Sequence, residues 1–449
     1  MSNIYDFPLP ARLLRKYVNM TFRRFYNEYI VVGRENIPSN CPIIFAPNHI
    51  NALMDALAVH SIAPNGLPVI FLARSDIFKN KFVAKLLQYL NMMPAFRMRD
   101  GMENLSKNNE IFERCVEVLH QNKALGIMPE GNQGEERKLR PFSKGIFRIA
   151  FAAQQKYGTT SAVKIIPIGI DYGDLEKFGK HIIINIGKPI EVSEYIANFE
   201  ENSAIATNEI RDRLSTDLSN LTLDLITEKN YKSFETATEV ANTAVLSALK
   251  LPNKSIYKFV ARQKTAKILR TLENDEPKKI AELELLCTEY TDCLQKINLK
   301  NWTIEQKPYK SASLILEFLL LLGTFVVFIF GFLLNFLPFM IPVVLRKAMK
   351  VQYVGFYSSI QFVFAIIFTF PVFYVLQTVL FCCLLSVPWW VGMSFFISQY
   401  LTGKLAFSWY RAAKRYMAKI RYRSLMSKKS YVLQQAENLQ KKIIQLIIN

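Results

Sequence analysis

A histidine and an aspartate follow a short apolar run near the start of the chain. The run, residues 43–46, lies between two prolines and predicts a buried strand that ends abruptly. His49 comes directly after this strand, and Asp55 lies six positions beyond His49. A carboxylate can hold one imidazole nitrogen protonated while the other nitrogen takes a proton from a nucleophile. The pair therefore has the parts of a general base with its orienting partner, and a polar pair at a structural turn is the alternative.

Helix geometry limits how these two side chains can meet. Residues that are six positions apart on a regular α-helix point about 120° apart, because each residue turns the helix by about 100°. If His49 contacts Asp55, we therefore expect His49 to lie outside the helix, on the loop that follows the strand.

Two arginines at alternate positions form a second chemical feature. Arg97 and Arg99 lie in a segment that we expect to be extended. Alternate side chains of an extended segment point to the same side, and guanidinium groups suit a phosphate. The segment therefore predicts a phosphate site, and a surface salt bridge with Asp100 is the alternative.

A glycine-bearing loop follows another apolar run. Residues 128–134 read Met-Pro-Glu-Gly-Asn-Gln-Gly, and basic residues follow, among which Lys144 is an anion-binding candidate from its charge alone. Backbone N–H groups of such a loop can bind an anion. Gly126 and Gly131 have the G-x4-G spacing of a P-loop. Asn132 and Gln133 replace the Lys-Ser/Thr pair, so we reject nucleoside triphosphate binding.

Candidate strands and helices alternate from about residue 35 to residue 190. The candidate strands are residues 43–46, 69–72, 124–128, 164–170 and 182–186. The candidate helices are roughly residues 52–62, 80–90, 103–121 and 144–157. This alternation predicts an α/β domain with a largely parallel sheet flanked by helices. Functional residues gather at the carboxyl ends of parallel strands, and His49, Arg74 and Glu130 all fall at such ends.

These motifs resemble, in the same order, the four sequence blocks of the glycerolipid acyltransferase family. The blocks are Asn48-His49 with Asp55, Pro94-x-x-Arg97, Pro129-Glu130-Gly131 and Ile166-Pro167-Ile168. The family includes glycerol-3-phosphate and 1-acylglycerol-3-phosphate acyltransferases, and the resemblance covers about residues 30–190. The chain departs from the family in two places. Five residues separate His49 from Asp55 where the family usually has four, and Asn132-Gln133 replace the usual Thr-Arg.

The resemblance implies a reaction and a role for each matching residue. His49 would deprotonate a hydroxyl of a glycerol phosphate acceptor, whose oxygen would attack the thioester of acyl-CoA or acyl carrier protein. Asp55 would orient His49 and stabilise its cationic form. Arg97 and Arg99 would bind the acceptor phosphate. The other predicted substrate-binding residues are Asn48, Glu130, Gly131 and Lys144. The acyl thioester is a co-substrate, and no metal or redox cofactor is needed.

The composition favours a membrane over nucleic acid as the partner of the basic residues. The net charge is +19, and about half of it lies in the tail at residues 404–449, directly after a long apolar region. A basic segment in that position predicts binding to anionic membrane lipids. The six cysteines lack CxxC spacing, so we expect free thiols and no zinc site. The first ten residues have no apolar signal-peptide core.

The remaining segments predict helices of three kinds. Residues 8–31 have a basic amphipathic pattern, which fits either a membrane interface or a helix packed on the next domain. Residues 195–312 are charged and helical, and they fit a spacer or lid. Residues 318–345 and 351–403 carry no charge, and a spanning helix needs about 20 residues. The second run can hold two passes, and the first holds one pass or a bent re-entrant pair.

The sequence therefore predicts a chain of five parts. These are basic amphipathic helices at 1–34, an α/β acyltransferase domain at 35–195, a charged helical region at 196–312, transmembrane or re-entrant helices at 313–403, and a basic cytoplasmic tail at 404–449. Basic flanks prefer the cytoplasmic side, so the first apolar run enters and returns on one side if the loop and the tail are both cytoplasmic. If that run crosses once, three passes result and one end faces out. We expect the catalytic domain on the cytoplasmic face, because it lacks disulfide spacing and its acyl donors are cytoplasmic.

The prediction is an integral membrane O-acyltransferase of phospholipid synthesis. Its acceptor is 1-acylglycerol 3-phosphate, with glycerol 3-phosphate as the alternative. From another class, the alternative is a membrane-anchored lipid-binding scaffold in which the His–Asp pair is structural. A transporter is disfavoured, because the apolar runs lack the ionisable residues that transport pathways commonly use.

Overall fold

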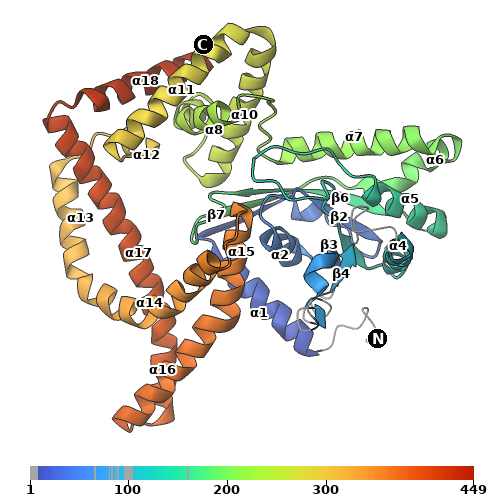
Figure 1. The fold of residues 1–449 in the computed structure, drawn as a ribbon, viewed down its shortest axis with the longest axis horizontal. Helices are drawn as coiled ribbons and strands as arrows, with labels where there is room; N and C mark the ends of the chain where they lie inside the picture. The colour runs from blue at the N-terminus through green and yellow to red at the C-terminus, as the bar shows by residue number, and fades with distance from the viewer. Residues whose placement is uncertain are drawn as a thin grey trace. The chain divides into compact units, whose positions relative to one another are not determined.

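The computed structural model divides the chain into two compact units. The first comprises Met1–Asp224 and Gln352–Ser359, and the second comprises Leu225–Val351 and Ile360–Asn449. The structure describes residues 9–448 except 65–66, 80, 82–83, 86, 88–90, 96–104 and 159–160. Figure 1 shows the elements of both units.

The first unit is built on a mixed, mainly parallel sheet. Its strands are β1 (Glu28–Val32), β2 (Ile43–Pro47), β3 (Val69–Arg74), β4 (Met92–Ala95), β5 (Ala124–Gly126), β6 (Lys164–Tyr172), β7 (His181–Ile186) and β8 (Ile190–Glu191). Their order is β1-β7-β6-β2-β5-β3-β4, and β8 pairs with β6 beside this path. The pairs β6–β7 and β6–β8 are antiparallel, and the other pairs are parallel. The central strand β2 is buried along its whole length.

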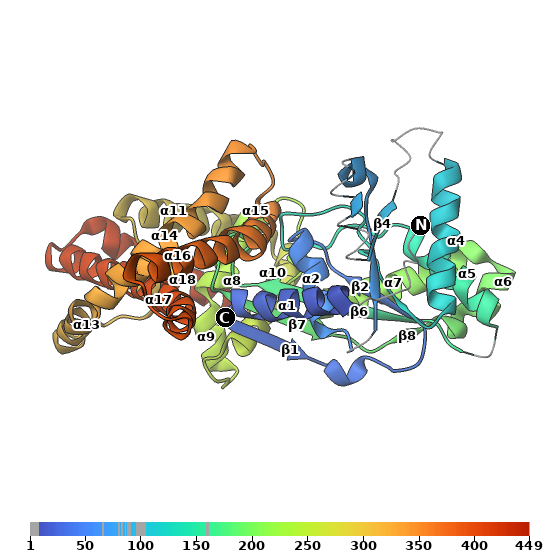
Figure 2. The same cartoon turned by 90° about the horizontal axis from the view of Figure 1, so that it is seen from below.

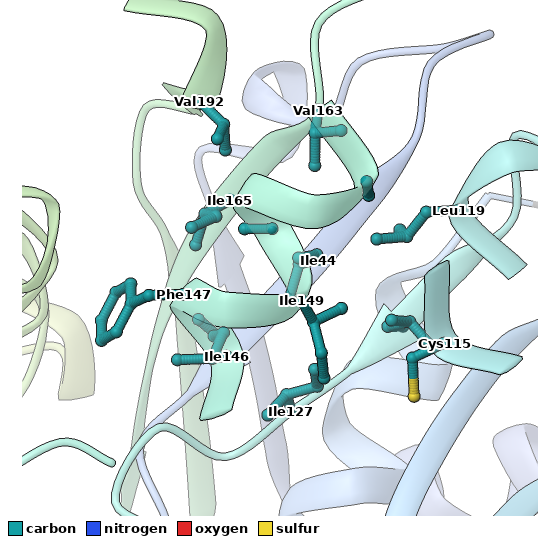
Figure 3. Close-up of a cluster of buried hydrophobic side chains, with 14 of the residues drawn as sticks. Ile44, Cys115, Leu119, Ile127, Ile146, Phe147, Ile149, Val163, Ile165 and Val192 are labelled. Carbon is teal, nitrogen blue, oxygen red and sulfur yellow. The ribbon is translucent and has the colours of Figure 1, made fainter. Parts of the chain in front are cut away.

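Helices cover this sheet and enclose an apolar core. They are α1 (Leu9–Phe25), α2 (Leu53–Ile62), α4 (Leu105–His120), α5 (Gly145–Tyr157), α6 (Ile196–Glu201) and α7 (Ser203–Leu221), with short 3-10 turns at Arg34–Asn36, Ser75–Lys79 and Val192–Tyr195. Figures 1 and 2 show α4, α5 and α6 packed together beside the sheet. In the core under these helices, Ile44 of β2 lies among side chains of α4 and α5, such as Cys115 and Ile149 (Figure 3). Burial of such apolar side chains is the main driving force for this packing.

The predicted fold class is confirmed, and the structure corrects several element boundaries. All five predicted strands form, although β5 ends at Gly126 and β6 continues to Tyr172. The predicted helices at 52–62, 103–121 and 144–157 correspond to α2, α4 and α5, whereas much of 80–90 lies outside the described residues. The prediction of helix through residue 31 is wrong beyond Phe25, because residues 28–32 pair with β7 as edge strand β1. This strand has only five residues, and its β-branched residues are consecutive, so the sequence shows no alternation with a period of two.

The first helix, α1, packs on the α/β domain. Phe22 and Phe25 are buried, and two arginines donate hydrogen bonds to carbonyl oxygens of α2 and of the segment that follows it. Arg15 Nη1 bonds to the carbonyl oxygen of Leu67 at 2.7 Å, and Arg23 Nη2 bonds to that of Ser61 at 2.7 Å. Of the two predicted alternatives for this helix, the structure therefore shows the second: this face of α1 packs on the next domain.

The second unit is helical. Its helices are α8 (Tyr231–Val240), α9 (Asn242–Ala248), α10 (Ser255–Asp275), α11 (Pro277–Ile297), α12 (Asn301–Glu305), α13 (Ser311–Gly323), α14 (Phe325–Ala348), α16 (Phe370–Leu385), α17 (Trp389–Ser427) and α18 (Tyr431–Ile448). The short helix α15 (Tyr357–Phe362) and the π-helical turn Val363–Thr369 precede α16. Apolar residues of α18, including Leu439 and Ile443, join a buried core with α11 (Figure 1). The described part of the basic segment, residues 404–448, therefore consists of the end of α17 and of α18, and α18 is packed.

Two helical segments are long and apolar enough to cross a membrane. They are Phe325–Ala348 and Val354–Leu385, with mean hydropathies of 2.3 and 2.1, and little of either is buried. A polar side chain, Asn335, lies between these helices and α17. Its Nδ2 donates to the carbonyl oxygens of Gly331 at 2.9 Å and Gln399 at 3.1 Å, and its Oδ1 accepts from the Tyr374 hydroxyl at 2.6 Å. These bonds satisfy a polar group inside an otherwise apolar helix cluster.

Candidate active site

The loop after β2 is held to the neighbouring strand β6 by an asparagine. Asn48 is buried, its Nδ2 donates to the carbonyl oxygen of Ile170 at 3.1 Å, and its Oδ1 accepts from the Ile170 N–H at 2.7 Å. Both ends of the amide are thus used on the backbone of β6. Asn48 was predicted to bind substrate, and the structure gives it the different task of fixing where the loop leaves the sheet. Its substrate contact stays a prediction.

His49 and Asp55 meet as the sequence predicted. His49 Nδ1 lies 2.9 Å from Asp55 Oδ2, and the imidazole is partly exposed whereas the carboxylate is fully buried. His49 lies on the loop, and Asp55 lies in the first turn of α2, so the pair avoids the 120° divergence of a regular helix. With Nδ1 donating to the carboxylate, Nε2 becomes the nitrogen that can accept a proton from a ligand.

Three further donors fix the carboxylate of Asp55. Its Oδ2 accepts the backbone N–H groups of Ile50 at 2.9 Å and Asn51 at 2.7 Å, and its Oδ1 accepts the hydroxyl of Tyr172 at 2.7 Å. Burial, and then the charge of Asp55, hold the pKa of Tyr172 well above its usual range, so this hydroxyl remains a donor. The position at the N-terminus of α2 also favours a negative group.

The loop between His49 and Asp55 contains one residue in an unusual backbone conformation. Ala52, directly before α2, has φ 44° and ψ −121°. Positive φ values are uncommon for residues with a Cβ atom, and such strain persists only where the surroundings fix it. The His–Asp contact therefore forms across five intervening residues, one of which, Ala52, is strained.

Glu130 supports the His49 loop from the next loop. Its Oε1 accepts the His49 N–H at 2.8 Å, and its Oε2 accepts Arg140 Nε at 2.9 Å and the Arg140 N–H at 3.2 Å. Burial raises the pKa of this carboxyl, and the bonds from His49 and Arg140 oppose that rise. Both carboxylate oxygens are thus occupied by protein donors, so Glu130 is a positioning residue here. Its predicted contact with substrate stays a prediction.

The glycines of this loop let it follow the backbone of His49. Gly131 has φ 67°, a conformation that glycine adopts without a Cβ penalty. Three residues later, the Gly134 N–H donates to the carbonyl oxygen of His49 at 2.9 Å. The N–H and the carbonyl of His49 are therefore both bound by residues 130–134.

One further predicted residue, Lys144, has no contact with this cluster in the described structure, and two others lie outside the described residues. Lys144 is exposed at the position directly before α5. Arg97 and Arg99 lie outside the described residues, so their predicted phosphate contact stays a prediction. Within the described part of the chain, no group of three or more His, Cys, Asp or Glu side chains is placed to hold a metal ion.

Sequence reasoning missed two contributors to the site. The Tyr172 hydroxyl binds Asp55 from the end of β6, and Arg140 binds Glu130. The apolar run that predicted β6 was ended at residue 170, which left Tyr172 in an unassigned connection. Arg140 is one of the basic residues that follow the loop in the sequence, and nothing in the spacing shows which carboxylate it contacts.

The domain that contains the His49 loop is similar to known proteins. Residues 28–171 match the family model described as Acyltransferase. The chain is 27% identical over 207 residues to glycerol-3-phosphate O-acyltransferase 1 of Saccharomyces cerevisiae, which covers 45% of this chain and 26% of that protein. It is also 27% identical over 163 residues to 1-acyl-sn-glycerol-3-phosphate acyltransferase of Borreliella burgdorferi, which covers 36% of this chain and 58% of that protein. Each match therefore spans less than two thirds of the relative's length.

A solved structure is also similar in part. The crystal structure of the 1-acyl-sn-glycerophosphate acyltransferase PlsC from Thermotoga maritima aligns with a TM-score of 0.33 and 19% identity, over 46% of this chain and 78% of that one.

The family model and the curated relatives support a glycerolipid acyltransferase family for residues 28–171. This is the family that the order of the four motifs indicated. The family-matched range ends at Asp171, and it includes β1, the His49 loop and most of β6.

Proposed function

We propose that the chain is a membrane-bound O-acyltransferase that moves a fatty acyl group from a thioester donor to the hydroxyl of 1-acylglycerol 3-phosphate. The observation that carries the proposal is the His49–Asp55 pair, joined at 2.9 Å on a loop whose backbone is held from both sides. Membership of the acyltransferase family supports acyl transfer as the reaction.

The chemistry follows from the two nitrogens of one imidazole. Nε2 of His49 accepts the proton of the acceptor hydroxyl as its oxygen attacks the thioester carbonyl carbon. Asp55 stabilises the resulting imidazolium through Nδ1. When the carbon–sulfur bond breaks, the imidazolium returns the proton to the leaving thiolate. The products are the ester and the free thiol of CoA or of acyl carrier protein.

The identity of the acceptor is the more specific part of the proposal. Two apolar helices long enough to span a membrane support an acceptor that is itself a lipid. Glycerol 3-phosphate is the second candidate, and the match to a protein named glycerol-3-phosphate O-acyltransferase in Saccharomyces cerevisiae favours it. Both acceptors have a hydroxyl and a phosphate, so either one would transfer its hydroxyl proton to His49 in the same way.

The proposed location is a membrane with the catalytic domain on the cytoplasmic side. The two candidate spans support insertion. Arg346 and Lys347 at the end of the first span, and Lys350 after it, favour a cytoplasmic loop. Acyl-CoA and acyl carrier protein would be the soluble donors. Anionic membrane lipids would bind the basic residues of α17, with no part for nucleic acid.

Acyl transfer by detergent-purified full-length protein tests the proposal. Labelled acyl-CoA and acyl carrier protein are offered separately, each with 1-acylglycerol 3-phosphate or glycerol 3-phosphate. We expect a diacyl product from the lipid acceptor, formed in preference to product from glycerol 3-phosphate. Preference for glycerol 3-phosphate would move the assignment to the first acylation step.

A folded protein that transfers no acyl group in any of the four combinations would contradict the proposal. Binding of the same protein to anionic vesicles, with no turnover, would favour the scaffold alternative instead. Retention of the protein in membranes after an alkaline carbonate wash tests the location, since a peripheral protein would be released.

A further inference from the structure

We propose that residues 352–359, here called the strap, are a positioning element for the catalytic loop. This inference rests on the function proposed above. The strap belongs to the same compact unit as the His49 loop, although it lies about 300 residues further along the chain. In Figure 1 the orange start of α15 lies beside α2, whose first turn carries Asp55.

The strap binds the residue that lies between His49 and Asp55. Ser358 Oγ donates to Asn51 Oδ1 at 2.7 Å, and the longer contact of Ser359 Oγ with the Asn51 carbonyl oxygen is 3.4 Å. Asn51, Ser358 and Ser359 are all buried. The N–H of the same Asn51 donates to Asp55 Oδ2, so one residue connects the strap to the catalytic carboxylate.

The strap also packs against both loops of the site. A Cβ added at Gly355 would lie 2.1 Å from Gln133 Nε2 and 2.6 Å from the carbonyl oxygen of Ile50. Only a residue without a side chain allows this approach. At the other end, the Val354 N–H donates to Glu135 Oε1 at 2.9 Å. The strap therefore touches the His49 loop and the Glu130 loop together.

The loop has a physical need for such support. Ala52 occupies a positive-φ conformation, which is strained for a non-glycine residue and persists only where the surrounding structure holds it. Asn51, its neighbour, has an exposed fraction of 1% and finds in Ser358 a partner for its side-chain oxygen. Removal of this partner would leave a buried acceptor unpaired, which destabilises the local conformation.

The same residues begin a candidate membrane span. The apolar segment Val354–Leu385 starts within the strap, so the element that binds Asn51 continues covalently into an apolar helix. The strap would thus make the geometry of the catalytic pair depend on a segment outside the family-matched residues 28–171.

Two variants test the strap, each with a matched control. Ser358→Ala removes the bond to Asn51, and Gly355→Ala forces the strap away from Ile50. Ser394→Ala and Gly323→Ala are the controls, because Ser394 bonds only within its own helix in the described structure and a Cβ at Gly323 meets nothing within 4 Å. All are full-length proteins in detergent, and thermal unfolding verifies that each one folds.

The first readout is independent of any assigned reaction. Hydrogen exchange of peptides covering residues 48–55 reports the N–H groups of Ile50 and Asn51 that bind Asp55. We expect faster exchange there in both strap variants and no change in the controls. If Gly355→Ala does not fold, Ser358→Ala decides the result. Exchange equal to wild type in a folded Ser358→Ala protein would overturn the proposal.

The second readout is kinetic. We expect Ser358→Ala to lower kcat about tenfold with KM nearly unchanged, because misplacement of the base affects the transition state more than binding. An Asn51→Ala,Ser358→Ala double variant should lose no more activity than Asn51→Ala alone, since residues that act through one contact are not additive. Fully additive losses would overturn the claim that Ser358 acts through Asn51.

The two readouts separate the two proposals. Faster exchange in the strap variants of a protein that is inactive with every acyl donor and acceptor pair would support the strap and overturn only the assigned reaction. Normal exchange in variants of an active enzyme would overturn the strap and leave the reaction standing.

Discussion

At the scale of single residues, the geometry of the site depends on the orientation of one carboxylate. Asp55 accepts bonds from the His49 ring, from two backbone N–H groups and from the Tyr172 hydroxyl. A carboxylate offers about four acceptor positions, so these donors account for its capacity. Such a group has little freedom to rotate, and the imidazole bound to it is held in one tautomer and one direction.

Removal of the Tyr172 hydroxyl should weaken this orientation without unfolding the domain. Tyr172→Phe keeps the buried ring and deletes the donor to Asp55 Oδ1. We expect kcat to fall about tenfold at similar KM, the loss that follows when one orienting contact of a general base is removed. Steady-state kinetics measure this change. Tyr431→Phe, at an exposed position, is the control, and wild-type kcat in Tyr172→Phe would show that this donor has no part in positioning.

At the scale of elements, α2 carries both the catalytic carboxylate and a buried histidine. Asp55 lies in its first turn and His60 in its last, and nearly every residue of the helix is buried. Burial, and then the nearby Arg15 charge, lower the pKa of His60 from 6.5 to about 3. The ring therefore stays neutral in the folded protein over the pH range in which it would be protonated in the unfolded chain.

This lowered pKa predicts acid sensitivity of the first unit. Because the folded-state pKa is depressed, the contribution of neutral His60 to stability is fully present above pH 6.5 and is lost as the pH falls towards 3. The loss is about 1.4 kcal/mol per pH unit within that window. Thermal unfolding between pH 7 and pH 5 measures it.

His60→Gln removes the titrating group and should flatten this pH dependence. The exposed His120, changed to Gln, is the matched control and should keep the wild-type slope. Equal slopes for wild type and His60→Gln would contradict a lowered pKa at this position.

The sequence predicted those elements that are marked by a pattern among neighbouring residues. The strand before His49 and the position of His49 outside α2 followed from two prolines and from the helical angle, and the structure confirms both. Strand β1 was missed because it has five residues and lies at the sheet edge with no fully buried side chain. A short edge strand shows little of the period that identifies a strand.

At the scale of the whole molecule, contacts between segments far apart in the sequence bring further residues to the site, and local sequence patterns do not predict these contacts. Ser358 lies 307 positions from Asn51, and the sequence around it reads only as the start of an apolar run. Tyr172 is similarly placed at the site because β6 pairs with β2, and Arg140 is placed there by the course of the chain after the Glu130 loop. No spacing rule links such residues, because their proximity is set by how the elements pack.

The second unit should depend on its buried polar network in the same way. Asn335→Ala removes bonds to Gly331, Gln399 and Tyr374 within the apolar helices. Hydrogen bonds between membrane helices contribute about 0.6 kcal/mol each, so we expect a loss of roughly 1–2 kcal/mol, seen as a lower thermal midpoint in detergent. Leu333→Ala, on the exposed face of α14, is the control. Unchanged stability in Asn335→Ala would show that the network does not hold these helices together.

The measurement that tests the central claim most directly is acyl transfer by His49→Ala, with His120→Ala as the matched control. Both variants are purified at full length, shown to unfold at the wild-type temperature, and assayed with the donor and acceptor that wild type prefers. We predict a fall in kcat of about 10²–10⁴-fold for His49→Ala, the usual contribution of a positioned acid–base group, and wild-type turnover for His120→Ala. Turnover by folded His49→Ala at the wild-type rate would contradict the assignment of His49 as the general base.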